Sequence, residues 1–238
     1  MIFQETTRKP IEGILLVDKP KSRTSFSLVA ALRRCLGVQK IGHAGTLDPM
    51  ATGVMVLLVG KKFTSQSMAL TGQDKEYEAT ITLGATTDSY DAEGNIVATS
   101  PHIPSLDDVE KATSYFNGTI EQIPPMFSAK KIDGQKLYDL ARKGQEVERK
   151  PVQITLTTTL LDYSYPYIKL HIACSKGTYI RSIAHDIGAR LSSGGHLSAL
   201  VRTRSGSFNL TDCVSGKTLF EAPLEEARQQ ALSQLILT

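Results

Sequence analysis

The sequence is poor in cysteine. Its three cysteines, Cys35, Cys174 and Cys213, are odd in number and far apart in the chain. None belongs to a CxxC pair or to the Cys/His spacing of a zinc site. The cysteine content therefore argues against a disulfide framework and gives no support to a zinc centre.

Long hydrophobic runs are also missing. The N-terminal stretch MIFQETTRKPIEG has no continuous apolar segment of the kind found in signal peptides. The longest apolar runs, such as 54–59, are far shorter than the roughly 20 residues that a membrane-spanning helix needs. We therefore expect a cytoplasmic protein that does not enter a membrane.

No strong excess of one charge is present. The chain of 238 residues has 27 Lys and Arg against 24 Asp and Glu, a formal net charge of +3. With 41% hydrophobic and 21% charged residues, it has enough apolar side chains for a core and is too balanced in charge for a disordered chain. This mildly basic composition permits an acidic partner such as nucleic acid without identifying one.

Common catalytic motifs are absent. The sequence has no GxxxxGK[ST], GxGxxG, HExxH or GxSxG motif and no deaminase HxE with PCxxC, so it lacks the usual signals for ATP, dinucleotide, protease, esterase and deaminase chemistry. The turn DSYDAEGN breaks the EF-hand pattern at Tyr90, and Asp48 has no second carboxylate at ligand spacing. We therefore expect chemistry without a metal or an organic cofactor.

The hydrophobic patterns predict an α/β protein. Residues 13–19 form a short apolar run before Pro20, which predicts a strand, and the next apolar spacing predicts a helix that begins near Thr24 or Ser25 and stops at Gly37. The segment 41–53 contains three glycines and a proline, which predicts a loop. Further strands are expected near 75–84, 154–161, 167–174 and 206–210, and helices near 105–116, after 176 and over 218–237.

Asp48, in GHAGTLDP, is the first candidate for chemistry. Pro49 disfavours a helical backbone at Asp48, and the glycines nearby allow the chain to approach a ligand closely. The same pattern also fits an ordinary Asp-Pro turn whose side chain bonds its own backbone. His43 fits a general base, a phosphate contact or a hydrogen-bonding spacer.

Aromatic and basic residues suggest an RNA surface. Tyr77 on an alternating strand, and Tyr179 with Arg181 in KGTYIR, fit base stacking and carboxylate pairing, or a core aromatic and a surface ion pair. The segment 130–150 is rich in Lys and Arg around Tyr138, which fits an RNA-backbone contact or a solvated helical face. Local sequence leaves these alternatives open.

Several segments, taken in order, closely resemble the TruB-type tRNA pseudouridine synthases. They are GILLVDKPKSRTSF, KIGHAGTLDPMATGVMVLLVG, KEYEATITLGATTDSYDAEG, IPPMFSAKKIDGQKLYDLARKG and CSKGTYIRSIAHDIG. The resemblance extends from about residue 13 to 210. It implies the pseudouridine synthase fold, an α/β (α+β) architecture with a large mixed, mostly antiparallel sheet flanked by helices.

The resemblance implies isomerisation of uridine 55, in the T loop of tRNA, to pseudouridine without metal or cofactor. Asp48 then corresponds to the nucleophile, which acts at C1′ or, in a glycal route, at C2′. Arg181 corresponds to its arginine partner and Tyr77 to the tyrosine that stacks on the flipped base. His43, Tyr179 and Leu200 match substrate-pocket positions, and Lys19 and Lys130 are further candidates for substrate contacts.

The resemblance also predicts the domain organisation. We expect a single catalytic domain over 1–238, monomeric, with an insertion at about 124–152 that clamps the T arm of tRNA. Many bacterial members continue into an RNA-binding PUA domain, and the thirty or so residues after the last expected strand are too few for one. Two other functions stay open: a tRNA-folding helper that acts without catalysis, and a small-molecule hydrolase that uses Asp48 and His43.

Overall fold

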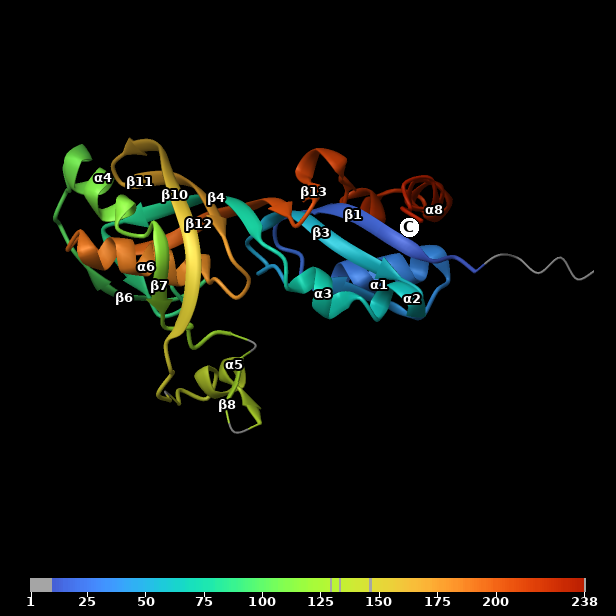
Figure 1. Cartoon of the computed structure of the whole chain (residues 1–238), viewed down its shortest axis with the longest axis horizontal. Helices are drawn as coiled ribbons and strands as arrows, with labels where there is room; N and C mark the ends of the chain where they lie inside the picture. Colours follow the sequence, from blue (N-terminus) through green and yellow to red (C-terminus); the bar gives the residue numbers. More distant parts are fainter. Residues whose placement is uncertain (1–9, 129, 133, 146, 238) are drawn as a thin grey trace, which may run out of the picture. The chain divides into compact units, whose positions relative to one another are not determined.

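The computed structural model describes residues 10–128, 130–132, 134–145 and 147–237 (Figure 1). The described chain divides into two compact units. Unit 1 contains the residues up to Gln73 together with those from Arg204 onward, and unit 2 is Asp74–Thr203. Each unit has strands flanked by helices, and most strand pairs are antiparallel, in agreement with the predicted α/β fold class.

Unit 1 combines strands from both ends of the chain. The strands pair in the order β14-β1-β3-β2, with β14 parallel to β1 and the other pairs antiparallel. Its elements are β1 Gly13–Lys19, α1 Ser25–Leu36, β2 Ile41–Ala44, β3 Thr52–Val59, α2 Lys61–Thr64, α3 Ser67–Thr71, β13 Phe208–Asn209, the 3-10 turn η1 Leu210–Asp212, β14 Val214–Ser215, α7 Thr218–Glu221 and α8 Leu224–Ser233.

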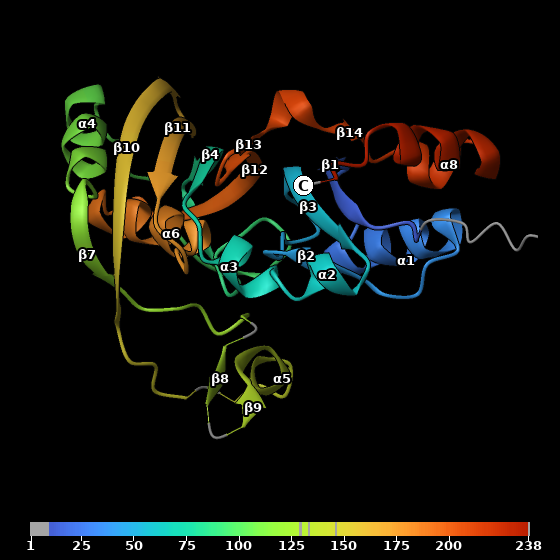
Figure 2. The same ribbon diagram turned by 45° about the vertical axis from the view of Figure 1, so that its right-hand side comes forward.

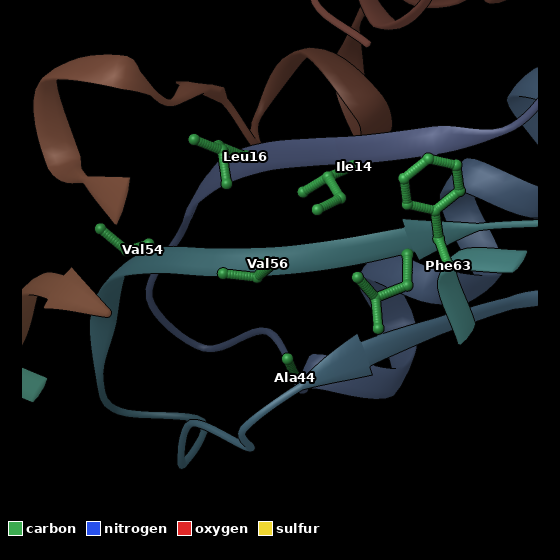
Figure 3. Close-up of a cluster of buried hydrophobic side chains, with 7 residues drawn as sticks. Ile14, Leu16, Ala44, Val54, Val56 and Phe63 are labelled. Atoms are coloured by element: carbon green, nitrogen blue, oxygen red, sulfur yellow. The ribbon is translucent and has the colours of Figure 1, made fainter. Parts of the chain in front are cut away.

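Alternation along β1 and β3 places apolar side chains on both faces of this sheet. One face carries a buried cluster that includes Ile14, Leu16, Val54, Val56 and Phe63 (Figure 3). The intervening residues of the same strands point to the opposite face because successive side chains alternate, and they are buried as well. The sheet that carries the Asp48 loop is therefore covered on both sides.

Helix α1 begins and ends where its sequence predicts. The hydroxyl oxygen of Thr24 accepts a hydrogen bond from the backbone N–H of Ser27 over 3.0 Å, as an N-cap residue does. Gly37 closes the helix in the left-handed region, with φ 70°. Near this end, Arg228 of α8 donates from Nη1 to the carbonyl oxygens of Cys35 and Leu36, over 3.4 and 3.5 Å.

Unit 2 is built on strands in the order β12-β4-β11-β10-β7. Its elements are β4 Lys75–Leu83, the hairpin of β5 Ala85–Thr87 and β6 Ile96–Thr99, α4 Leu106–Ser114, β7 Gly118–Gln122, β8 Lys131–Ile132, β9 Gln135–Lys136, α5 Leu137–Ala141, β10 Val152–Ser164, β11 Tyr167–Cys174, α6 Ile180–Arg190 and β12 Gly195–Ser205, whose last two residues belong to unit 1. The buried sides of β4 and β11 include Ile81, Leu170 and Ile172, and α6 contributes Ile183 and Ile187 to the apolar interior.

A small substructure interrupts unit 2 between β7 and β10. Strands β8 and β9 pair in a hairpin, and α5 follows directly, away from the main strands of this unit (Figure 2). It falls in the range, about 124–152, that the resemblance assigns to an insertion.

Three local predictions are wrong. Residues 41–44 form strand β2 rather than part of a loop, because their backbone pairs with 56–59 of β3. The long strand β12 was not predicted, and only 208–209 are extended within the expected strand 206–210. The predicted C-terminal helix is divided into α7 and α8 at Pro223, which lacks the N–H that a helix interior needs.

Candidate active site

The Asp48 loop is tethered on the N-terminal side of the aspartate. The hydroxyl group of Ser25, in the first turn of α1, accepts a hydrogen bond from the backbone N–H of Leu47 over 2.9 Å and lies 3.1 Å from its carbonyl oxygen, to which it donates. Both Ser25 and Leu47 are buried. The residue before Asp48 is therefore fixed to a helix.

The residue after Asp48 is fixed as well. The carbonyl oxygen of Pro49 accepts from the backbone N–H of Ser22 over 2.9 Å and from the ammonium group of Lys19 over 3.1 Å. Asp48 itself starts a turn in which its carbonyl oxygen accepts from the N–H of Ala51 over 3.1 Å. The half-buried Asp48 side chain thus projects from a backbone that is held on both sides.

Lys19 is fully buried, with no exposed surface. Its ammonium group donates to the carbonyl oxygens of Pro20, Arg23 and Pro49, over 3.1, 2.5 and 3.1 Å. These bonds satisfy a buried cation with backbone oxygens. The geometry favours a positioning role for Lys19 beside the Asp48 loop over direct contact with a substrate.

His43 lies on β2 rather than in a loop. It stands opposite Leu57 in the β2–β3 register and is half-buried, and its carbonyl oxygen accepts from the hydroxyl of Ser67 over 3.2 Å. Unit 1 therefore contains Asp48, Lys19 and His43 of the predicted site.

Arg181 lies in the first turn of α6 and is 6% exposed. Its Nη1 is 3.6 Å from Oδ2 of Asp91 and donates to the carbonyl oxygen of Ser89 over 3.3 Å. Its Nη2 donates to the carbonyl oxygen of Phe127 over 2.8 Å. The guanidinium group is therefore held in unit 2 by two segments outside its own helix.

Asp91 is the main site residue that the sequence did not predict. It is 4% exposed, and its Oδ1 accepts from the hydroxyl of Ser89 over 2.6 Å and from the N–H of Glu93 over 3.0 Å. The serine two residues before it was a local signal for a carboxylate folded back on its own turn. The ion pair with Arg181 spans 90 residues of sequence, and no local pattern predicts it.

Tyr77 and Leu200 lie on neighbouring strands of unit 2 and are buried, at 8% and 7% exposure. Tyr77 stands opposite Ile172 in the β4–β11 register. Nearby charges are buried too: burial lowers the pKa of Lys75, and the positive charge of Arg202, itself 1% exposed, lowers it further.

Tyr179 precedes α6 and is held through its backbone by Gln122, the last residue of β7. The Gln122 amide group accepts from the N–H of Tyr179 over 2.8 Å and donates to its carbonyl oxygen over 3.0 Å. Gln122 is 1% exposed. This reciprocal pair fixes the start of α6, two residues before Arg181.

The insertion presents basic and aromatic side chains. Arg142 lies over the ring of Tyr138, 4.5 Å from its centroid, and the Tyr138 ring packs edge-on against Phe127 with centroids 6.1 Å apart. Lys130 is half-buried, and its carbonyl oxygen accepts from the N–H of Leu137 over 2.9 Å. Phe127, whose carbonyl oxygen accepts from Arg181, is thus itself part of the insertion and packs against Tyr138.

The predicted residues therefore fall into two sets. Unit 1 holds Asp48, Lys19 and His43, and unit 2 holds Tyr77, Lys130, Tyr179, Arg181 and Leu200. Among the described residues no group of His, Cys, Asp and Glu is arranged to hold a metal ion. No helix in the described part of the chain is long and apolar enough to cross a membrane.

Two family models match the chain. Residues 33–180 match the model described as TruB family pseudouridylate synthase (N terminal domain). Residues 181–238 match the model described as tRNA pseudouridylate synthase B C-terminal domain. The boundary between the two matches falls at the start of α6.

Relatives named tRNA pseudouridine synthase B align over most of this chain. The protein from Protochlamydia amoebophila is 60% identical over 87% of this chain and 79% of its own length. The protein from Opitutus terrae is 48% identical over 94% of both chains. A chain in the crystal structure of a Cbf5-Nop10-Gar1 complex superposes with a TM-score of 0.69 and 27% identity, covering 93% of this chain and 60% of that one.

Proposed function

This chain belongs to the TruB family of pseudouridylate synthases, and we propose that it isomerises uridine 55 in the T loop of tRNA to pseudouridine. The relatives named tRNA pseudouridine synthase B support tRNA as the substrate. The observation that carries the assignment of the nucleophile is the double tether of the Asp48 loop, through Ser25 on one side and Lys19 on the other. A carboxylate on a fixed backbone suits attack at a defined carbon atom.

The proposed reaction exchanges one bond for another within the nucleotide. The N1–C1′ bond of uridine breaks, the uracil turns, and C5 bonds to C1′; the proton on C5 is lost and N1 gains one, so the product is an isomer. Asp48 either attacks C1′ or removes a proton from C2′ in a glycal route. Both routes need Asp48 as a carboxylate, and neither needs a redox step.

Arg181 is the proposed cationic partner of Asp48. A guanidinium group stays charged at any relevant pH and favours the ionised form of a nearby carboxylate. Its bonds to Asp91, Ser89 and Phe127 support this role because they fix its orientation before substrate binds. Asp91 is then a positioning residue that acts through Arg181.

The other predicted residues serve substrate binding in this proposal. The target base must leave the T-loop stack, which costs a few kcal/mol that stacking and backbone contacts offset. Tyr77 stacks on the flipped base, Tyr179, Leu200 and His43 line its pocket, and Lys130 belongs to the insertion that clamps the T arm. Lys19 holds the Asp48 loop through its hydrogen bond to the carbonyl oxygen of Pro49 rather than touching RNA.

The decisive experiment compares the purified chain with Asp48→Asn in single-turnover reactions on an unmodified tRNA transcript. Product is mapped to the nucleotide, and a transcript with cytidine at position 55 serves as the substrate control. Asp107→Asn, at an exposed aspartate of α4, is the matched protein control. We expect product at uridine 55 with the native chain and the control variant, and none with Asp48→Asn.

Two results would contradict the proposal. Unchanged product yield from Asp48→Asn would remove the assigned nucleophile. Tight tRNA binding by the native chain, without any pseudouridine, would favour the folding helper, which refolds the T arm without chemistry.

We also predict a monomer that works in the cytoplasm and needs no metal or organic cofactor.

A further inference from the structure

The rings of Tyr90 and His185 are stacked, with centroids 3.9 Å apart and planes inclined by 14°. We infer that this stack holds the Asp91–Arg181 ion pair in its working geometry, which makes Tyr90 and His185 positioning residues for the reaction. The inference rests on the proposed function, because it assigns both rings to the support of the proposed partner of Asp48. Neither residue is assigned to touch the substrate.

The ring stack and the ion pair involve the same two elements, the 88–95 turn and α6. Tyr90 is the residue directly before Asp91 in the 88–95 turn. His185 follows Arg181 by four residues on α6, so the two side chains lie on the same side of the helix, one turn apart. The turn and the helix are therefore joined twice, once by charge and once by ring stacking.

The backbone at Tyr90 indicates that its ring is needed. Its φ is 65°, in the left-handed region, which is unfavourable for a bulky side chain and easily adopted by glycine or asparagine. The turn is held there by β12, because Leu197 donates to the carbonyl oxygen of Tyr90 over 3.0 Å and accepts from the N–H of Ala92 over 2.9 Å. A tyrosine in this strained position implies that the side chain offsets its backbone cost.

The helix is fixed against the same strand. A Cβ atom added to Gly188 of α6 would collide with the backbone of Gly194 and Gly195, so α6 and the start of β12 touch through their main chains. Strand β12 thus contacts both the 88–95 turn and α6 through its main chain. The Tyr90–His185 stack closes this arrangement by joining the turn directly to the helix.

The ion pair needs such support. Oδ1 of Asp91 accepts hydrogen bonds within the turn from Ser89 and Glu93, and Oδ2 lies 3.6 Å from Nη1 of Arg181. Ser89 contributes its carbonyl oxygen to the same guanidinium group. A shift of the turn would therefore move two of the partners of Arg181 together, and small displacements of positioning groups reduce catalytic rates strongly.

His185 acts through its ring face. Its Nδ1 is buried and has no hydrogen-bond partner among the residues that the structure describes. Burial also lowers the pKa of His185, which keeps the imidazole neutral near pH 7. A neutral ring without a hydrogen bond from Nδ1 contributes chiefly by packing against Tyr90.

The test compares Tyr90→Gly with Tyr90→Phe, and His185→Ala with His185→Phe. Tyr90→Gly removes the ring and relieves the backbone, whereas the two Phe variants keep an aromatic ring in place. We expect Tyr90→Gly and His185→Ala each to lower the single-turnover rate constant on tRNA about tenfold, with less than about a twofold change in tRNA affinity and near-native rates in the Phe variants. The double variant should be no slower than the slower single one, because both changes break the same contact.

A second readout does not depend on activity. The side-chain NMR signals of ¹⁵N-labelled arginine, with Arg181 assigned by the loss of its signal in Arg181→Lys, report the guanidinium environment. The Arg181 signal should move or broaden in Tyr90→Gly and His185→Ala and stay in place in Tyr90→Phe. This result would support the positioning role of the stack even if the native chain formed no pseudouridine. The absence of pseudouridine would refute the proposed function but not this role.

Three outcomes would overturn the inference. They are native rates and an unmoved Arg181 signal in Tyr90→Gly, additive losses in the double variant, and equal losses in Tyr90→Phe and Tyr90→Gly. If His185→Ala does not fold, the Tyr90 pair still decides the question, because glycine suits the backbone at this position.

Discussion

The ammonium group of Lys19 donates a hydrogen bond to the carbonyl oxygen of Pro49 over 3.1 Å, across 30 residues of sequence. Pro49 directly follows the proposed nucleophile, Asp48. A buried lysine thus joins the end of β1 to the Asp48 loop, and the same ammonium group also binds the carbonyl oxygens of Pro20 and Arg23.

We predict that Lys19→Met weakens both the fold and catalysis. Three carbonyl oxygens lose their charged donor, so the free energy of unfolding should fall by about 2 kcal/mol. The single-turnover rate should fall as the Asp48 loop loosens, while tRNA affinity changes little. Urea unfolding and single-turnover assays test this, with Lys61→Met at an exposed lysine of α2 as the control. Lost tRNA affinity at native stability would instead make Lys19 an RNA contact.

Some of this architecture is visible in the sequence because it is local. The alternating apolar residues of 75–83 and 167–174 predict β4 and β11, and Thr24 and Gly37 mark the ends of α1. Strand β12 breaks the pattern because it buries a charged residue, Arg202, which is 1% exposed.

The contacts that hold the candidate site are long-range, and sequence patterns do not contain them. Lysine is a common residue type in phosphate contacts, and only the fold shows that Lys19 is buried. The sequence shows Asp91 only as part of a polar turn. In the structure it lies 3.6 Å from Arg181, which is 90 residues further along the chain. The loop around Asp48 marked it as a candidate, and the resemblance implied the roles of Asp48, Arg181 and Tyr77. The contacts that hold them are visible only in the structure.

Gln122 provides another test of the support around Arg181. Gln122→Leu leaves the backbone N–H and carbonyl of Tyr179 without their amide partner, so the free energy of unfolding should fall by about 1–3 kcal/mol. The single-turnover rate should also fall, because the start of α6 is released. Gln153→Leu, at an exposed glutamine of β10, is the control. Native stability in Gln122→Leu would show that these two hydrogen bonds contribute little.

Tyr77→Ala should reduce turnover more than binding. Stacking of a base on an aromatic ring contributes about 1–3 kcal/mol, which corresponds to roughly a 5- to 150-fold lower single-turnover rate if the stack forms on the flipped base. Tyr77→Phe keeps the ring and should stay within a few-fold of the native rate. Because Tyr77 is buried, thermal unfolding of both variants is measured alongside. Lost tRNA affinity with a native rate at saturation would contradict the stacking role.

The insertion should contribute electrostatically to tRNA binding. The double variant Arg142→Ala with Lys143→Ala removes two exposed cations, so the plot of log affinity against log salt should become shallower by up to about 2 units. Lys111→Ala with Lys169→Ala removes two exposed cations elsewhere in unit 2 and is the charge-matched control. An equal salt slope in both double variants would show that these two cations of the insertion do not contact the tRNA backbone.

Asp186 of α6 predicts a pH dependence of stability. Burial raises the pKa of Asp186 from 3.8 to about 6, so the folded chain binds this proton more tightly than the unfolded chain does. The carboxyl group therefore destabilises the fold once it ionises, and its unfavourable contribution grows as the pH rises from about 4 to about 7. Asp186→Asn cannot ionise, and its free energy of unfolding should exceed that of the native chain by up to about 3 kcal/mol at pH 8, with the pH-dependent part of this difference gone near pH 4. Urea unfolding across this range measures the effect, with Asp162→Asn at an exposed aspartate of β10 as the control. A difference between Asp186→Asn and the native chain that does not vary with pH would show that Asp186 keeps an ordinary pKa in the folded protein.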